Sequence, residues 1–175
     1  MDSISFKIAR AIKNADPDHT SSIEVMQYAL SIILNTLFIV TVSLVVGWLT
    51  GRYQETLITL AALVIMRMAS GGRHLSEAWQ CNIVSILLCV GVPIIAASIS
   101  GNILLIMNML SLSIMLMFAP SPDPSVHIPS KIFPYLKTLS VILVASNFLI
   151  GSAVIGFAFF VQSLTIIPFG RRDKP

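Results

Sequence analysis

Long apolar stretches separated by short polar segments dominate the chain. Charged residues are absent from four runs, at residues 25–51, 56–66, 78–122 and 138–170. A transmembrane helix needs about 20 apolar residues, so the first run is long enough for one span and the third and fourth are each long enough for two. The second run extends only about 16 Å as a helix. It crosses a membrane only if Arg67, which follows it, snorkels or points into a protein cavity.

This pattern predicts an all-α integral membrane protein, with six short transmembrane helices preceded by an N-terminal amphipathic helix. We expect one membrane domain over residues 1–175, with residues 1–24 as the leader. Gly101-Asn102 and Gly151-Ser152 are expected to separate neighbouring spans, and residues 119–130 hold four prolines and form a stiff connector. The expected spans cover roughly residues 28–50, 54–69, 79–100, 103–118, 135–150 and 153–169.

The leader has the pattern of a short amphipathic helix over residues 2–14. Isoleucines recur at every fourth position with basic residues beside them: Ile4, Ile8 and Ile12, and Lys7, Arg10 and Lys13. Such a helix lies on a membrane surface with its basic side chains toward the headgroups, or it packs on its own protein, and both interpretations stay open. Asp16-Pro17-Asp18 ends the helix, and Ser21-x-x-Glu24 is a capping box that starts the next one.

Composition agrees with a membrane protein. Hydrophobic residues make up 55% of the chain and charged residues 11%, against roughly 25% charged in soluble domains. Disordered, nucleic-acid-binding and disulfide-scaffold classes are thereby excluded, and the expected partner is the lipid bilayer. Cys81 and Cys89 share one apolar run. A helix separates them by about 12 Å, beyond the roughly 7 Å Cα separation that a disulfide tolerates.

Basic residues indicate the topology. With six spans and the N-terminus inside, ten of the 11 basic residues fall on the inner side and only Arg52 lies outside. Five spans lower the inner count to about seven because the basic C-terminus then moves outside. The positive-inside rule therefore favours six spans with both termini in the cytoplasm.

One short segment concentrates the residues that carry chemistry. The sequence RMASGGRHLSEAWQC, residues 67–81, holds Arg67, Arg73, His74, Glu77 and Cys81 at the expected cytoplasmic edge of two spans. Ionisable residues at membrane depth are costly and are functional candidates by default. A cysteine with a histidine suggests a thiol nucleophile and its general base.

Spacing limits how such a dyad forms. His74 and Cys81 lie seven positions apart, which is about 10.5 Å along a straight helix, whereas a proton transfer needs about 2.6–3.2 Å. The backbone around His74 must therefore fold back, and Gly71-Gly72 is the flexible element that permits it. Backbone amides near these glycines, or at the start of the third span, are candidates for an oxyanion hole. A zinc site fits poorly because the usual ligand number and spacing are missing, so we expect neither a metal nor a cofactor.

The string Arg67-x3-Gly71-Gly72-x-His74-x6-Cys81, after a short second span, resembles the accessory gene regulator B (AgrB) family. These are bacterial membrane thiol endopeptidases that process the pro-peptide of a quorum-sensing signal. The resemblance extends over essentially the whole chain and implies that Cys81 is the nucleophile and His74 the catalytic histidine. It also implies an AgrD-like pro-peptide as substrate, a homodimer, and an active site at the cytoplasmic face of the bacterial cell membrane.

The chain departs from the family pattern at two places. Leu75 follows the histidine where a small residue is more usual, which affects the shape of the pocket. Fewer basic residues follow the connector than in the family, which weakens the match there. Neither departure touches the dyad.

Other charged residues have a functional and a structural interpretation each. Glu77 and Asp123 are candidates to orient His74, but a glutamate at a helix start also complements the helix dipole, and Asp123 also reads as a solvated loop acid. The basic candidates for binding an acidic substrate also read as snorkelling or anchoring residues: Arg67, Arg73, Lys131 and Lys137.

The sequence thus predicts a cysteine endopeptidase that cleaves a pro-peptide and promotes thiolactone or lactone closure through an acyl-enzyme. The alternative is a small transport or export component in which Arg67, Arg73 and Glu77 line a polar path. A further alternative is a structural membrane subunit in which the pair of His74 and Cys81 is incidental.

Overall fold

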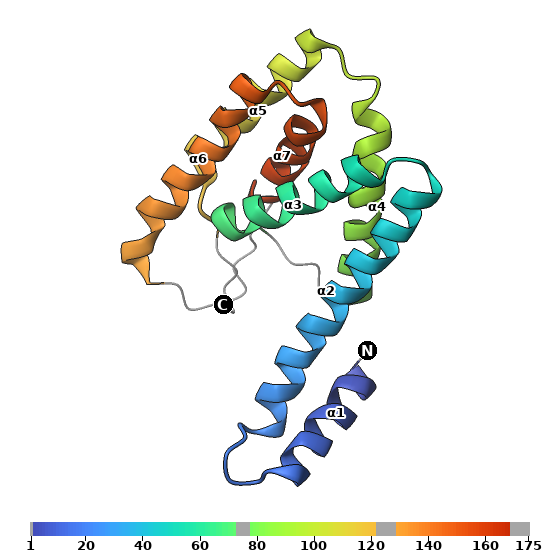
Figure 1. Ribbon diagram of the computed structural model, residues 1–175. Coiled ribbons are helices and arrows are strands. Elements are labelled where there is room, and N and C mark those ends of the chain that lie inside the picture. Colours follow the sequence, from blue (N-terminus) through green and yellow to red (C-terminus); the bar gives the residue numbers. More distant parts are fainter. Residues whose placement is uncertain (1, 73–77, 122–128, 169–175) are drawn as a thin grey trace.

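The computed structural model describes residues 2–72, 78–121 and 129–168, and this part of the chain is entirely helical apart from its turns (Figure 1). The described helices are α1 (Asp2–Ala15), α2 (Ile23–Leu49), α3 (Tyr53–Ser70), α4 (Ala78–Ala96), α5 (Gly101–Phe118), the 3₁₀ turn η1 (Ser130–Ile132), α6 (Phe133–Ile150) and α7 (Ala153–Thr165).

Helix α7 lies at the centre of the bundle. It packs against α3, α4 and α5, while α6 packs against α5 and α3, and α2 against α3 and α4. In Figure 1, α3 crosses in front of α7, with α5 and α6 to one side and α4 to the other. The hydrophobic cluster between these helices consists of aliphatic, methionine and phenylalanine side chains, and polar side chains such as Asn108, Asn147 and Gln162 are buried as well. The members of the cluster are Ala62, Met66, Val92, Met115, Ala119, Val144, Ala158, Phe159 and Ile166.

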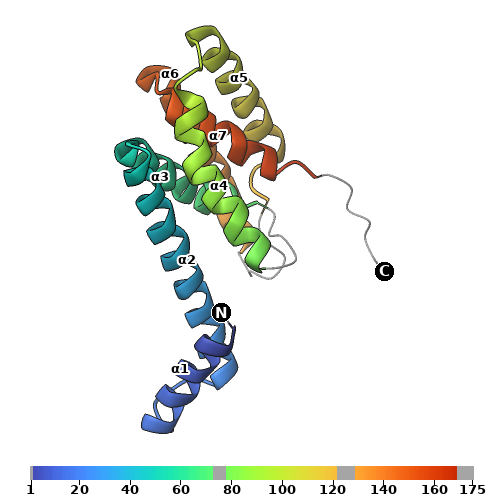
Figure 2. The same ribbon diagram turned by 90° about the vertical axis from the view of Figure 1, so that its right-hand side faces the viewer.

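Helix α1 runs antiparallel to the first half of α2, and the two extend away from the rest of the bundle (Figures 1 and 2). Ser5 and Ala9, one helical turn apart, are fully buried, whereas Ile4 is 56% exposed and Ile8 and Ile12 are also exposed. The leader therefore packs on its own protein through its small residues, which allow the close approach, and its isoleucines remain uncovered.

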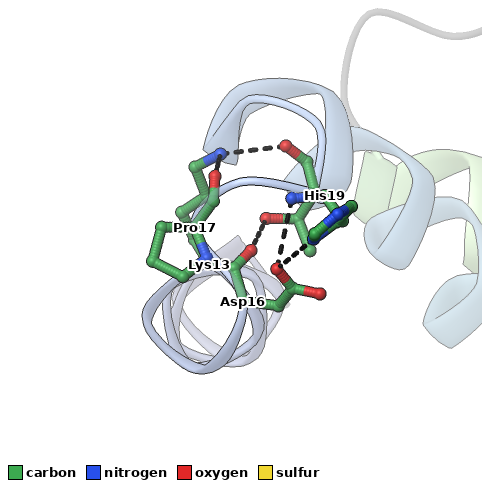
Figure 3. Close-up of polar contacts among 5 residues, drawn as sticks. Lys13, Asp16, Pro17 and His19 are labelled. Atoms are coloured by element: carbon green, nitrogen blue, oxygen red, sulfur yellow. Dashed lines mark hydrogen bonds and ion pairs between the residues drawn. The ribbon is translucent and has the colours of Figure 1, made fainter.

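The turn after α1 is held by its own polar side chains (Figure 3). Lys13 Nζ donates to the carbonyls of Pro17 and Thr20 at 2.7 and 2.9 Å. Asp16 Oδ1 accepts from the His19 backbone N–H, and the His19 ring Nδ1 lies 3.1 Å from the same oxygen. The predicted break at Asp16 is thus an ordered turn.

The turn between α4 and α5 lies earlier than the sequence suggests. Helix α4 ends at Ala96, whereas Gly101 and Asn102, the expected hinge, are the first residues of α5. Pro93 lies inside the last turn of α4, where it has no N–H to donate to the carbonyl four residues earlier, and the helix ends three residues later. Arg52 Nη1 donates to the Pro93 carbonyl at 3.4 Å and so supports this end of α4. The expected break at Gly151-Ser152 is found, since Gly151 ends α6 in the left-handed region with φ of 67°.

Among the described residues, four helical segments are long and apolar enough to cross a membrane. They are α2, Trp79–Ala96 of α4, α5, and Ser130–Ile150, which joins η1 and α6. Helix α7 is apolar but has only 13 residues, and α3 carries Glu55 and Arg67. The structure therefore gives an all-α membrane protein with four long candidate spans, and the count of six expected from the sequence rests on α3 and α7.

Candidate functional site

Helix α3 is followed by Gly71 and Gly72, which form a turn that we call the glycine turn. The backbone conformation of both residues favours glycine. Gly71 has φ of 73° and ψ of −146°, and Gly72 has φ of 139°. Side-chain-bearing residues rarely adopt either conformation. The turn is closed locally by two hydrogen bonds, from the Gly71 N–H to the Arg67 carbonyl at 2.9 Å and from Ser70 Oγ to the Met66 carbonyl at 2.8 Å.

The start of the proline-rich connector lies against this glycine turn. The Gly72 N–H donates to the Ser121 carbonyl at 3.0 Å, and the Ser121 N–H donates to the Ser70 carbonyl at 2.8 Å, which makes a short parallel bridge. Two segments that the sequence analysis treated separately are therefore joined through their backbones.

Helix α7 contacts the same turn from the opposite side. Gln162, only 4% exposed, donates through Nε2 to the Gly71 carbonyl at 2.8 Å and lies 3.5 Å from Ser70 Oγ. An added Cβ at Gly72 would lie 2.8 Å from Thr165 Oγ1 and 3.1 Å from Gln162 Nε2. The glycine turn is thus enclosed by the end of α3, the connector and the last turns of α7.

Arg67 brings its guanidinium to the same place. Its Nη1 lies 3.5 Å from the position that a Cβ at Gly72 would occupy. Arg67 stands in the last turn of α3, where a positive charge complements the helix dipole. The half-buried Arg67 side chain therefore lies at the glycine turn. Of the two expected orientations, snorkelling to the membrane surface or pointing into the protein, this position matches the second.

Cys81 lies in the first turn of α4 and is half-buried, whereas Cys89 is buried two turns further along; both thiols are free. This start of α4 is fixed on α2 by the hydrogen bond from Asn82 Nδ2 to Asn35 Oδ1, 3.2 Å long. Cys81 therefore stands on a defined element next to a polar contact between two helices.

The N–H groups of the two glycines are already used. The Gly71 N–H donates to Arg67 and the Gly72 N–H to Ser121, so neither is available as an oxyanion donor in this arrangement. The expectation that the glycines supply an oxyanion hole therefore fails for these two amides.

Several predicted site residues lie outside the described residues, namely Arg73, His74, Glu77 and Asp123. Of the two basic candidates after the connector, Lys131 is exposed in η1 and Lys137 is half-buried in the second turn of α6. Among the described candidate residues, Arg67, Gly71 and Gly72 lie together at the glycine turn, and Cys81 lies at the start of α4.

Sequence reasoning missed the residues that enclose the glycine turn from elsewhere in the chain, Ser121 and Gln162. Gln162 did carry a signal, because an amide in the charge-free run of residues 138–170 needs a hydrogen-bond partner within the protein. Nothing local identified which partner it has. Ser121 acts through its backbone, so its residue type carried no signal.

The chain is similar in sequence to known proteins over most of its length. The family model described as "Accessory gene regulator B" matches residues 5–169. Accessory gene regulator protein B of Staphylococcus aureus strain JH9 is 25% identical over 172 residues, covering 92% of this chain and 91% of the relative. Protein FsrB of Enterococcus faecalis is 24% identical over 162 residues, covering 86% of this chain and 67% of the relative.

A third relative matches over a shorter segment. An AgrB-like protein of Halalkalibacterium halodurans is 28% identical over 92 residues, which covers 53% of this chain and 47% of that protein. No solved structure matches the chain.

Proposed function

Because the chain belongs to the accessory gene regulator B family, we propose that it is a membrane cysteine endopeptidase that cleaves an AgrD-like signal pro-peptide. The observation that carries the proposal is the glycine turn between Arg67 and Cys81. In a chain with several apolar helices, this turn has a glycine-specific backbone and is bonded to both the connector and α7. It lies directly before the segment that holds the catalytic histidine of the family motif.

In the proposed reaction His74 takes the proton of the Cys81 thiol, because the thiolate is the attacking species. The thiolate adds to the carbonyl carbon of the scissile peptide bond. The C–N bond then breaks, the proton on His74 passes to the leaving amine, and a thioester joins the N-terminal fragment to Cys81. Amides at the start of α4 are the donors proposed for the oxyanion.

The second half of the reaction closes a ring. A thiol or hydroxyl within the bound fragment attacks the thioester carbonyl, and the Cys81 thiolate leaves with a proton returned to it. The product is a thiolactone or a lactone. This exchange keeps the activated acyl bond that hydrolysis would destroy, and it suits a quorum-sensing signal that is a cyclic peptide.

Other residues have supporting roles in this proposal. Arg67, Gly71 and Gly72 form the turn beside the dyad, and either Glu77 or Asp123 orients His74. Arg73, Lys131 and Lys137 bind acidic groups of the pro-peptide. Arg67 fits its role because its guanidinium already lies at the glycine turn, and Lys131 is exposed as substrate contact requires.

We propose a topology of six spans in the bacterial cell membrane, with both termini and the active site at the cytoplasmic face. Helix α7 has 13 residues and α3 carries Glu55 and Arg67, but both pack extensively within the bundle and bury polar side chains there. Polar backbone and short helices are tolerated at membrane depth where protein covers them. We also propose that two copies form a homodimer.

The test combines purified protein in detergent or vesicles with an AgrD-like peptide. The parent protein and Cys89→Ala should cleave at one site, and Cys81→Ala and His74→Ala should lose cleavage. A peptide whose ring-forming thiol or hydroxyl residue is changed to alanine should accumulate as a thioester. Mass spectrometry should find its N-terminal fragment on Cys81, removable by hydroxylamine and absent from His74→Ala.

Two outcomes would overturn the proposal. An adduct on Cys89 would move the nucleophile, and cleavage that persists in Cys81→Ala would remove the thiol mechanism. Retention of Cys89→Ala activity is expected because the Cys89 thiol is buried about two turns from Cys81 along α4.

A further inference from the structure

The peptide unit between Gly71 and Gly72 is held at both of its polar ends. Its carbonyl, on Gly71, accepts from Gln162 Nε2 at 2.8 Å. Its N–H, on Gly72, donates to the Ser121 carbonyl at 3.0 Å. Because a peptide unit is planar, two bonds from different elements fix the direction in which this plane faces.

The restraint matters because a glycine stands on each side of this plane. Glycine adopts both positive and negative φ with similar ease, so nothing in the local sequence sets the orientation of the unit between two of them. Removing the bond to Gln162 would leave the Gly71 carbonyl with only Ser70 Oγ at 3.3 Å, which belongs to the preceding residue. The distant bond from α7 is the one that ties the plane to the bundle.

Among the described residues, the side-chain amide of Gln162 has its hydrogen-bond partners at the end of α3. Gln162 is 4% exposed, and its amide nitrogen points at Gly71 and Ser70, 91 and 92 positions earlier in the chain. Burying an amide inside an apolar helix bundle is unfavourable unless it is hydrogen-bonded. Its neighbour Ser163, also buried, bonds only to the Phe160 carbonyl of its own helix.

We propose that Gln162 is a positioning residue for the peptidase reaction, acting by fixing the Gly71–Gly72 peptide plane from α7. The inference rests on the proposed function. His74 follows Gly72 by two residues, and two residues reach at most about 7 Å, so the orientation of this plane limits where the His74 side chain can approach Cys81.

The experiment compares Gln162→Met, which keeps side-chain length and removes the donor, with Ser163→Ala as the matched control on the same helix. Both are made in Cys89→Ala, so that Cys81 is the only thiol. Steady-state cleavage should show kcat reduced about 10- to 100-fold in Gln162→Met, with KM within about twofold, while Ser163→Ala resembles the parent. Gln162→Asn, with an amide too short to reach Gly71, should show the same pattern if Gln162→Met is poorly produced.

Alkylation of Cys81 by iodoacetamide without peptide provides a readout in which general destabilisation has the opposite sign, because loosening the structure exposes the half-buried thiol and speeds its alkylation. His74→Ala should slow alkylation near neutral pH and shift its pH dependence upward. Gln162→Met should shift it in the same direction, and should add nothing in the His74→Ala background, because residues acting through one group are not additive.

The outcomes separate the two proposals. If His74→Ala changes alkylation and cleavage but Gln162→Met changes neither, Gln162 is not a positioning residue and the proposed function stands. Additive effects of Gln162→Met and His74→Ala would likewise overturn the inference. If His74→Ala alkylates and cleaves like the parent, the proposed function itself fails.

Discussion

At the scale of single residues, Gly72 combines a positive φ with close neighbours on the side where a Cβ would lie. Its φ of 139° is unfavourable for any residue with a side chain, and its missing Cβ leaves room for Thr165, Gln162 and Arg67. The spacing argument from the sequence required a break here. The structure supplies a different reason for glycine, since the position is both strained and enclosed.

Gly72→Ala should therefore impair the protein, and Gly91→Ala should not. The new Cβ at position 72 would lie 2.8 Å from Thr165 Oγ1, and the positive φ adds about 1–3 kcal/mol of strain. We expect a lower midpoint of thermal unfolding in detergent and loss of most cleavage activity. The measurements are a thermal melt and the peptide assay described above.

Gly91 is the matched control, because it lies in α4 with nothing within 4 Å of an added Cβ and no positive φ. Alanine is favoured over glycine within a helix by about 1 kcal/mol, so Gly91→Ala should melt at or slightly above the parent. Equal melting points and equal activity for the two variants would show that Gly72 tolerates a side chain and that the turn is not rigid.

At the scale of elements, three helices are joined by buried asparagines. Asn147 Nδ2 of α6 donates to Asn108 Oδ1 of α5 at 3.1 Å and to the Ser152 carbonyl at 3.1 Å. The Ser152 N–H donates back to Asn147 Oδ1 at 3.3 Å. Gly156 of α7 lies against both amides and the Leu104 side chain. The Asn147 side chain thus hydrogen-bonds to the backbone of the α6–α7 turn and links this turn to α5.

Asn147→Ala should loosen this junction. The substitution removes the donor to the Asn108 side-chain Oδ1 and the acceptor of the Ser152 N–H. Each such loss costs about 1–3 kcal/mol when the group is buried. Leu149→Ala is the control, because Leu149 is 92% exposed in the same helix, and a substitution away from buried contacts usually changes stability by less than about 0.5 kcal/mol. Thermal melts in detergent measure both.

The prediction has a functional consequence. Helix α7 carries Gln162 to the glycine turn, so a loosened α6–α7 junction should also lower kcat. If Asn147→Ala melts like Leu149→Ala, the asparagine contact does not contribute to stability and α7 is held by its apolar packing alone.

At the scale of the whole molecule, the number of membrane crossings decides where the ends lie. Four helical segments are long and apolar enough to span, and the proposal adds α7 and α3, which pack against each other and against several of these segments. An even number of crossings returns the C-terminus to the side of the N-terminus, as the distribution of basic residues favours.

Reporter fusions test this count. A fusion after Lys174 and a fusion within residues 123–130 should both read cytoplasmic, because six spans place both segments inside with the basic residues. A fusion beside Arg52 should read external and serves as the opposite control. An external reading after Lys174 would mean that either α3 or α7 does not cross.

The sequence alone determined the class of the protein, the positions of most helices and the family motif. These follow from local properties: charge-free runs, helix-capping patterns and glycine turns. The capping box expected at Ser21 is wrong by one position, because Ser22 caps α2 through the Val25 N–H. The sequence did not determine which surfaces meet. Periodicity identified the isoleucine positions of α1, but α1 packs through Ser5 and Ala9, because the contact depends on how closely its partner helix can approach and not on the apolar pattern of α1 alone.

Only the tertiary structure decided the surroundings of the glycine turn. Gly71 and Gly72 mark a break in any reading of the sequence, but their partners lie about 50 and 90 positions away, in Ser121 and Gln162. Hydrogen bonds between distant segments depend on how the helices pack, and one of the two bonds involves only backbone atoms. The local sequence thus determined that the chain turns here, and the packing of α7 and the connector determined which way the turn faces.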